Sequence, residues 1–180
     1  AELAAKIEYG ELKEGTYELG NGITVRTRYL NHPLLCLGYR FEHQGRVFCT
    51  AFDTEPYRNL FAGGVEGSAA DDTLAREGEH LAAQENRRLE EFFAGADLLV
   101  YDAQYLRREY EASRLGWGHS AIEHAIEAAQ RAQVKRLALF HHDPDRTDAQ
   151  LDALAARFCK RAPEGGMDIF FAREGLRIDL

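Results

Sequence analysis

Leu137-Ala-Leu-Phe-His-His-Asp-Pro144 is a short apolar run that ends abruptly in two histidines and an acid and is closed by a proline. The run has the length and composition of a buried strand. Polar side chains with lone pairs, placed where a buried strand meets a loop, are what a metal or catalytic site at a sheet edge requires. We expect three other residues to meet this stretch in space: His32, Asp53 and His119.

Strand patterns lie on both sides of this stretch. Residues 23–29 alternate strictly between polar and β-branched or apolar side chains, as a half-buried strand does. Residues 97–102 form a continuous apolar run that is too short for a helix and suits a strand buried on both faces. The same reasoning predicts hairpins over residues 6–12 with 16–19, 36–41 with 46–50, and 168–172 with 176–180.

Helical signals separate the later strands. Residues 74–93 place apolar side chains on one helix face, and Gly95 can end that helix. Ser120 and Glu123 have the spacing of a capping box, and Thr147 opens a further helix. Between residues 53 and 72 the composition is that of a long loop, whose role stays open. Antiparallel strands followed by alternating helix and strand predict one α/β domain in which a sheet packs against helices.

Composition limits what the chain can do. Its 180 residues carry a formal net charge of -8, which disfavours a broad nucleic-acid-binding face. No apolar run approaches the roughly 20 residues that span a bilayer, so we expect no membrane segment. The three cysteines are few and widely spaced, as reduced thiols in a cytoplasmic protein are.

Three short segments carry a resemblance to a known family: Leu30-Asn-His32-Pro33, Ala51-Phe-Asp53-Thr54 and Leu139-Phe-His141. With them the chain resembles the C-terminal part of a metallo-β-lactamase-fold hydrolase, in the branch of the tRNA 3′-end processing endonucleases and class II cyclic-nucleotide phosphodiesterases. The resemblance implies an αββα sandwich with two divalent ions at its edge. His32, Asp53 and His141 would be the metal ligands, with Asp53 bridging. Zinc suits these ligands best, and manganese or iron are alternatives.

Two further segments resemble that branch. Asp102-Ala-Gln lies where the endonucleases carry an acid followed by Ala-Thr, and Gly118-His119-Ser120 resembles their Gly-His-Ser-Thr segment. The resemblance implies that Asp102 orients His119, which faces the phosphoryl group. The plain alternative is that Asp102 only binds loop amides and that His119 is a neighbour of a capping serine.

One motif of that family is absent from the sequence, the leading H-x-H-x-D-H. Two accounts stay open: residue 1 lies downstream of the motif in a longer parent protein, or the chain is a degenerate, non-catalytic member. On the first account, residues 1–180 are the C-terminal portion of a single metallo-β-lactamase-fold domain that lacks its N-terminal strands. This portion would be inactive alone and would need the missing segment in cis or from another chain, and a homo-oligomer is one such arrangement.

The sequence therefore predicts a metal-dependent hydrolase, a phosphodiesterase acting on a small or cyclic phosphodiester. The acidic surface argues against tRNA as the substrate. The alternatives are a lactone or thioester hydrolase of the same superfamily and a non-catalytic sensory or scaffold module that keeps the fold. The only basic cluster near the site comprises Arg107, Arg108 and Arg114, which would either contact a substrate phosphate or balance Glu109 and Glu111.

Overall fold

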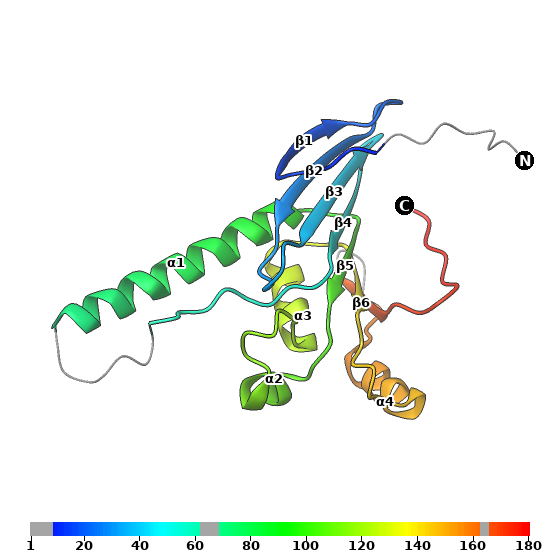
Figure 1. Ribbon diagram of the computed structural model, residues 1–180. Coiled ribbons are helices and arrows are strands. Elements are labelled where there is room, and N and C mark those ends of the chain that lie inside the picture. Colours follow the sequence, from blue (N-terminus) through cyan, green and yellow to red (C-terminus); the bar gives the residue numbers. More distant parts are fainter. Residues whose placement is uncertain (1–8, 62–68, 163–165) are drawn as a thin grey trace, which may run out of the picture.

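The computed structural model describes residues 9–61, 69–162 and 166–180, and of residues 69–71 only the backbone. These residues form one seven-stranded sheet in which the strands follow one another in chain order (Figure 1). The strands are β1 (Gly15–Glu18), β2 (Thr24–Tyr29), β3 (Leu37–His43), β4 (Arg46–Ala51), β5 (Leu98–Asp102), β6 (Arg136–Phe140) and β7 (Asp168–Phe171). The helices are α1 (Ala69–Phe93), α2 (Arg107–Ser113), α3 (Ile122–Arg131) and α4 (Asp148–Phe158).

The sheet changes character at β4. Strands β1 to β4 are antiparallel neighbours, and β4 to β7 pair in parallel. Tight turns join β1 to β2 and β3 to β4: Asn21 and Gly22 both have positive φ, as do Gln44 and Gly45. Parallel neighbours cannot be joined by a tight turn, so each connection after β4 contains a helix. The expected order of antiparallel strands followed by alternating helix and strand is confirmed.

This topology fixes where the predicted site residues lie. The carboxyl ends of β4, β5 and β6 share one edge because these strands are parallel. Asp53 follows β4, Asp102 ends β5 and His141 follows β6. Because β3 runs the opposite way, the β2–β3 loop with His32 reaches the same edge.

The core lies between the sheet and the helices. Alternate residues of β5 and β6, such as Leu99 and Leu139, are fully buried on the helix side of the sheet. Phe93 of α1 packs its ring against Tyr101 with a centroid distance of 5.9 Å. On α3, small side chains such as Ala125 allow that helix to approach closely, and Leu154 and Phe158 of α4 join the same cluster. The helices α1, α3 and α4 therefore pack on one face of the sheet.

Aromatic rings line the opposite face of the sheet. Tyr39, Phe41 and Phe48 form a stacked row, with centroid distances of 6.0 and 5.7 Å. At the site edge the rings of Phe52 and Phe140 lie 5.0 Å apart, and Phe140 is 40% exposed. This face is therefore apolar but only partly covered by the described residues.

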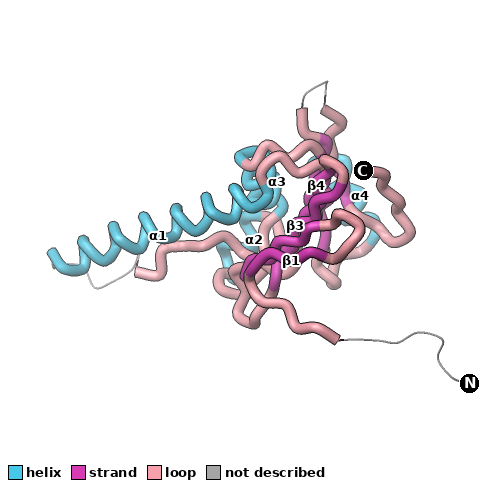
Figure 2. The backbone as a smooth tube through the Cα atoms, turned by 90° about the horizontal axis from the view of Figure 1, so that it is seen from above, coloured by secondary structure: helices cyan, strands magenta, loops and turns pink. Residues whose placement is uncertain are grey.

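The helix α1 begins at residue 69, before the predicted start at residue 74. Its N-terminal half extends well beyond the sheet in both views (Figures 1 and 2). The chain that follows Asp53 runs alongside it: the Asn86 amide binds both the N–H and the carbonyl of Tyr57, and Asn59 Nδ2 donates to the Ala75 carbonyl at 2.7 Å. Part of the predicted loop therefore acts as a strap for α1. No helix in the described part of the chain combines the length and the apolar character that crossing a bilayer demands.

Some local predictions were wrong. Ser120 and Glu123 form no capping box, because α3 begins at Ile122 and the Ser120 hydroxyl donates instead to the Thr54 carbonyl at 2.6 Å. Residues 176–180 form no strand, and neither do residues 9–12; the rest of the first predicted strand, residues 6–8, lies outside the described residues. The helix predicted to open at Thr147 is confirmed, and Thr147 and Gln150 form its capping box.

Candidate metal centre

Four side chains from separate segments meet at this edge of the sheet. Asp53, Asp102, His119 and His141 each offer one nitrogen or oxygen, and these atoms all lie within 4.8 Å of one another. His32 lies beside this group: its ring is 5.5 Å from the His119 ring, in an edge-to-face arrangement. The structure therefore brings four of the five predicted site residues into one cluster and places His32 at its border.

Asp102 is fully buried, and both of its carboxylate oxygens are occupied. Oδ1 accepts from the Gln104 amide at 3.2 Å, and Oδ2 accepts from the Thr54 amide at 3.2 Å and lies 2.8 Å from His119 Nδ1. A carboxylate with three such partners has little capacity left for a cation. The geometry therefore favours Asp102 as the residue that orients His119 over Asp102 as a metal ligand.

The charges of this pair are coupled. The hydrogen bond to Asp102 raises the pKa of His119, and burial partly opposes that rise. Burial raises the pKa of Asp102, while the neighbouring His119 lowers it. With Nδ1 held by Asp102, His119 Nε2 is the nitrogen that is free to face a ligand.

We expect this pair to make stability depend on pH in the metal-free protein. A histidine whose pKa is raised by folding contributes stability that is fully present below its unfolded pKa and is lost as pH rises through the folded value. The melting-temperature difference between the wild type and His119→Gln should therefore be larger at about pH 6 than at about pH 8.5. Calorimetry with a chelator present measures this melting-temperature difference. An equal difference at both pH values would contradict the pairing of His119 with Asp102.

Asp53 and His141 face each other across the centre of the cluster. Asp53 Oδ1 lies 3.0 Å from His141 Nε2, yet this oxygen is buried and has no hydrogen-bond partner among the described residues. An orphaned carboxylate oxygen beside an imidazole nitrogen is what a bound cation would satisfy, and about 3 Å is the separation of two ligands on one zinc ion. Asp53 and His141 therefore fit a divalent metal.

Gln104 supports His141 from behind, and the sequence reasoning missed this role. Its side-chain amide lies 3.1 Å from His141 Nδ1. An amide can present either its oxygen or its nitrogen, so Gln104 can bind His141 in either tautomer. Such partners of ligating histidines fix the ring orientation. The only signal in the sequence was that glutamine stands where the resembled endonucleases have threonine.

The backbone at the two facing residues is unusual. Asp53 has φ of 47° and His141 has φ of 58°, the left-handed region that non-glycine residues rarely adopt. Asp53 lies two residues after the end of β4, and His141 directly follows β6. Such conformations persist where the surrounding structure holds them, often at functional sites.

A second carboxylate, Glu55, fixes the loop that carries His119. Glu55 is 5% exposed, and its Oε2 accepts from the Tyr110 hydroxyl and from the Gly116 amide, both at 2.9 Å. Burial and the nearby Glu55 carboxylate together raise the pKa of Tyr110. The residues after Asp53 therefore hold the loop of residues 114–120 against the site. No sequence pattern pointed to Glu55, because its partners lie 55 and 61 positions away.

Gly118 permits His32 to approach His119. Its φ is +85°, and a Cβ atom there would lie 2.3 Å from His32 Cδ2 and 2.5 Å from Pro33 Cδ. We expect Gly118→Ala to lower the free energy of unfolding by about 2–4 kcal/mol, from left-handed strain plus overpacking. Urea unfolding measures this change.

Gly175→Ala is the matched control, because its φ is +76° and nothing lies within 4 Å of the added carbon. This control substitution should lower the free energy of unfolding only by the left-handed strain, about 1–2 kcal/mol. Equal costs at the two glycines would show that His32 is not held at this distance.

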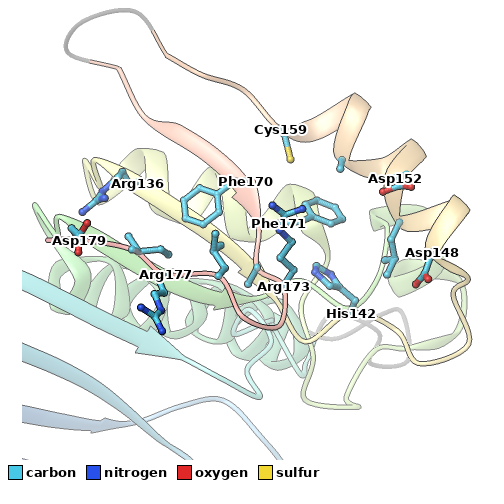
Figure 3. A pocket seen from close by; sticks show the side chains of 15 residues that line it. Arg136, His142, Asp148, Asp152, Cys159, Phe170, Phe171, Arg173, Arg177 and Asp179 are labelled. Atoms are coloured by element: carbon cyan, nitrogen blue, oxygen red, sulfur yellow. The ribbon is translucent and has the colours of Figure 1, made fainter.

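The second histidine of the strand-end pair points elsewhere. The His142 ring stacks on Phe171 with a centroid distance of 4.6 Å, and burial lowers the pKa of His142. It lines a groove of about 1010 Å³ between α4, β7 and the C-terminal segment. Figure 3 shows His142 beside Phe171 in that groove. His142 is therefore separate from the metal centre.

Comparisons with known proteins find relatives of part of this chain. Residues 81–142 match the β-lactamase superfamily domain. Over 57 residues, 32% of the chain, the sequence is 46% identical to ribonuclease Z of Thermococcus sibiricus, and the aligned part makes up 18% of that relative. Both matches cover about a third of this chain.

Solved structures share the fold. The metallo-β-lactamase-fold protein YhfI from Bacillus subtilis superposes with a TM-score of 0.57 and 17% identity, over 90% of this chain and 51% of that one. A diphosphatase of the PhnP family superposes with a TM-score of 0.54 and 18% identity, over 98% of this chain and 50% of that one. The chain thus spans about half the length of these structures. The chain therefore carries part of a metallo-β-lactamase fold.

Proposed function

We propose that the protein is a metal-dependent hydrolase of small or cyclic phosphodiesters. The observation that carries the proposal is the Asp102–His119 pair, 2.8 Å apart, directly beside the facing Asp53 and His141. A lactone or thioester hydrolase needs the metal ligands but not this pair. The names of two similar proteins, a ribonuclease and a diphosphatase, refer to cleavage at phosphorus and support the same choice.

Asp53 and His141 would hold the divalent metal, with His32 at the border of the cluster as a further ligand. When bound, such ions lower the pKa of a coordinated water and stabilise charge on a phosphoryl oxygen. The imidazole and carboxylate donors suit zinc. The described residues offer too few ligands for two ions. We propose that the remaining ligands come from a segment outside these 180 residues, in cis or from another chain.

His119 would donate its Nε2 proton to the phosphoryl or leaving oxygen. Its raised pKa keeps a larger fraction of the ring protonated near neutral pH. Asp102 holds Nδ1, so Nε2 is the nitrogen that can face the substrate. The net charge of -8 favours a small substrate over a long nucleic acid, whose phosphates would be repelled.

The natural, full-length protein tests the proposal with bis(p-nitrophenyl) phosphate, a generic phosphodiester, and p-nitrophenyl acetate, a generic ester. We expect zinc- or manganese-dependent hydrolysis of the phosphodiester that stops with a chelator. Hydrolysis of the ester with no turnover of the phosphodiester would overturn the proposal in favour of the lactone or thioester alternative. No metal in a clean preparation would favour the sensory or scaffold alternative.

A further inference from the structure

Glu55 is a buried acid that has no part in the proposed chemistry, although it follows Asp53 by only two positions. Its Oε2 accepts two hydrogen bonds, from the Tyr110 hydroxyl and from the Gly116 amide, both at 2.9 Å. Tyr110 belongs to α2, and Gly116 belongs to the loop that leads to His119. A single carboxylate oxygen therefore ties that loop to a helix.

Thr54, the residue before Glu55, holds the same region from the other side. Thr54 is fully buried, its amide donates to Asp102 Oδ2 at 3.2 Å, and its carbonyl accepts from the Ser120 hydroxyl at 2.6 Å. Asp102 Oδ2 is also the oxygen that lies 2.8 Å from His119 Nδ1. Thr54 is therefore bonded both to the partner of His119 and to the residue that follows His119.

Together these contacts anchor both ends of the span 117–119, which ends in His119. Gly116 and Gly118 have φ of +81° and +85°, and glycine passes between backbone conformations more easily than other residues. The span therefore depends on its anchors for a fixed shape. A shift at the Gly116 anchor would move the His119 imidazole relative to Asp53.

We propose that Glu55 is a positioning residue for the proposed hydrolysis: by binding the Gly116 amide, it sets where the His119 imidazole lies relative to the metal ligands. Glu55 acts through the loop and not on the substrate, because its Oε2 is engaged by two donors. A displacement of about 1 Å in a reacting group can cost about 100-fold in rate. The inference deepens the proposed function and rests on it for the role of His119.

Two substitutions of Glu55 separate the hydrogen bonds from the charge. Glu55→Ala removes the acceptor, whereas Glu55→Gln keeps an oxygen that can accept from both donors. In the natural, full-length protein with zinc, Glu55→Ala should lower kcat on bis(p-nitrophenyl) phosphate about 100-fold and change KM and zinc affinity less than about threefold. Glu55→Gln should retain kcat within about threefold. An unchanged kcat in Glu55→Ala, or an equal loss in both variants, would overturn the proposal.

Asp97→Ala is the control for a general loss of stability. Asp97 is 4% exposed, close to the value for Glu55, and it accepts from the Val47 amide and from Lys135 Nζ, both at 2.8 Å, at the opposite end of β5. Both alanine variants should be less stable in urea unfolding, because each leaves buried donors unpaired. Only Glu55→Ala should lose kcat, and an equal fall in Asp97→Ala would mean that Glu55 matters for stability alone.

Trp117 reports on the loop without any reaction, because it lies between the two anchors and is the single tryptophan of this sequence. Any further tryptophan of the full-length protein is first replaced by phenylalanine. In the metal-free protein, the fluorescence anisotropy of Trp117 should be lower in Glu55→Ala than in the wild type, since a freed loop moves on the nanosecond timescale. The anisotropy should be unchanged in Glu55→Gln and Asp97→Ala. Equal anisotropy in Glu55→Ala and the wild type would contradict the anchoring by Glu55.

A second variant keeps the test decisive if Glu55→Ala does not fold. Glu55→Met fills a similar volume without an acceptor, so it should give the same fall in kcat and in anisotropy. Failure of the two proposals is also distinguishable. Absence of hydrolysis in the wild type overturns the proposed function, whereas the anisotropy comparison still decides whether Glu55 holds the loop. Hydrolysis that Glu55→Ala and Glu55→Met leave intact overturns the positioning role alone.

Discussion

Asp53→Asn is expected to lower zinc affinity by at least about 100-fold and to reduce phosphodiester hydrolysis to the background level. Replacing outer partners of metal ligands costs about 10–100-fold in affinity, so loss of a charged ligand should reach or exceed that range. Asp53 Oδ1 is buried, lies 3.0 Å from His141 Nε2 and has no hydrogen-bond partner in the described structure. Asparagine keeps the shape but removes the charge. Competition with a chromogenic zinc chelator measures the affinity.

Asp53→Asn should leave the stability of the fold unchanged, because Asp53 Oδ1 makes no hydrogen bond in the described structure. Urea unfolding of the metal-free variant should match the wild type within about 1 kcal/mol. Glu111→Gln, at an exposed position of α2, is the charge-matched control and should leave zinc binding unchanged. Retention of tight zinc binding by Asp53→Asn would remove Asp53 from the metal centre.

The second large effect is expected at Asp102. Asp102→Asn should lower kcat by about 10⁴-fold while zinc binding is retained, the magnitude seen when the aspartate that orients the histidine of a serine protease is changed in the same way. The amide group would also face the donors of Thr54 and Gln104, which should lower the free energy of unfolding by about 1–3 kcal/mol. Steady-state kinetics and elemental analysis on the same preparation separate the two effects.

Asp97 is the matched control, because it flanks the other end of β5 and is likewise buried. It accepts from the Val47 amide and from Lys135 Nζ, both at 2.8 Å. Asp97→Asn should therefore lower the free energy of unfolding but leave kcat unchanged. If Asp102→Asn lost its zinc together with its activity, Asp102 would be a metal ligand, a role that its place within the cluster of four would then explain.

The sequence predicted the strands and the gathering of site residues at one edge for a local reason. Alternation and short buried runs mark β2, β5 and β6, and the carboxyl ends of parallel neighbours must share an edge. Acids and histidines directly after such runs, as at Asp53 and His141, could therefore be expected to meet before their contacts were known.

Predictions from the sequence were wrong or missing where a residue binds a group far away in the chain and not a sequence neighbour. Ser120 looked like a helix cap, but its hydroxyl binds the carbonyl of Thr54, 66 positions away. Glu55 and Gln104 support the site through contacts that no spacing encodes. The final hairpin failed for a similar reason: alternation in residues 176–180 favours a strand, but β7 pairs with β6 on one side and its Ile169 pairs with Lys160 on the other.

The left-handed turns at Asp53 and His141 have an evolutionary consequence. Glycine would adopt either conformation more easily, so an unconstrained lineage drifting toward greater thermal resistance should acquire glycine at these positions. Each lineage that keeps an acid and an imidazole there forgoes that gain. Sequencing stability-selected libraries of this protein, with and without a requirement for metal, would reveal whether the two positions turn to glycine only when the requirement is lifted.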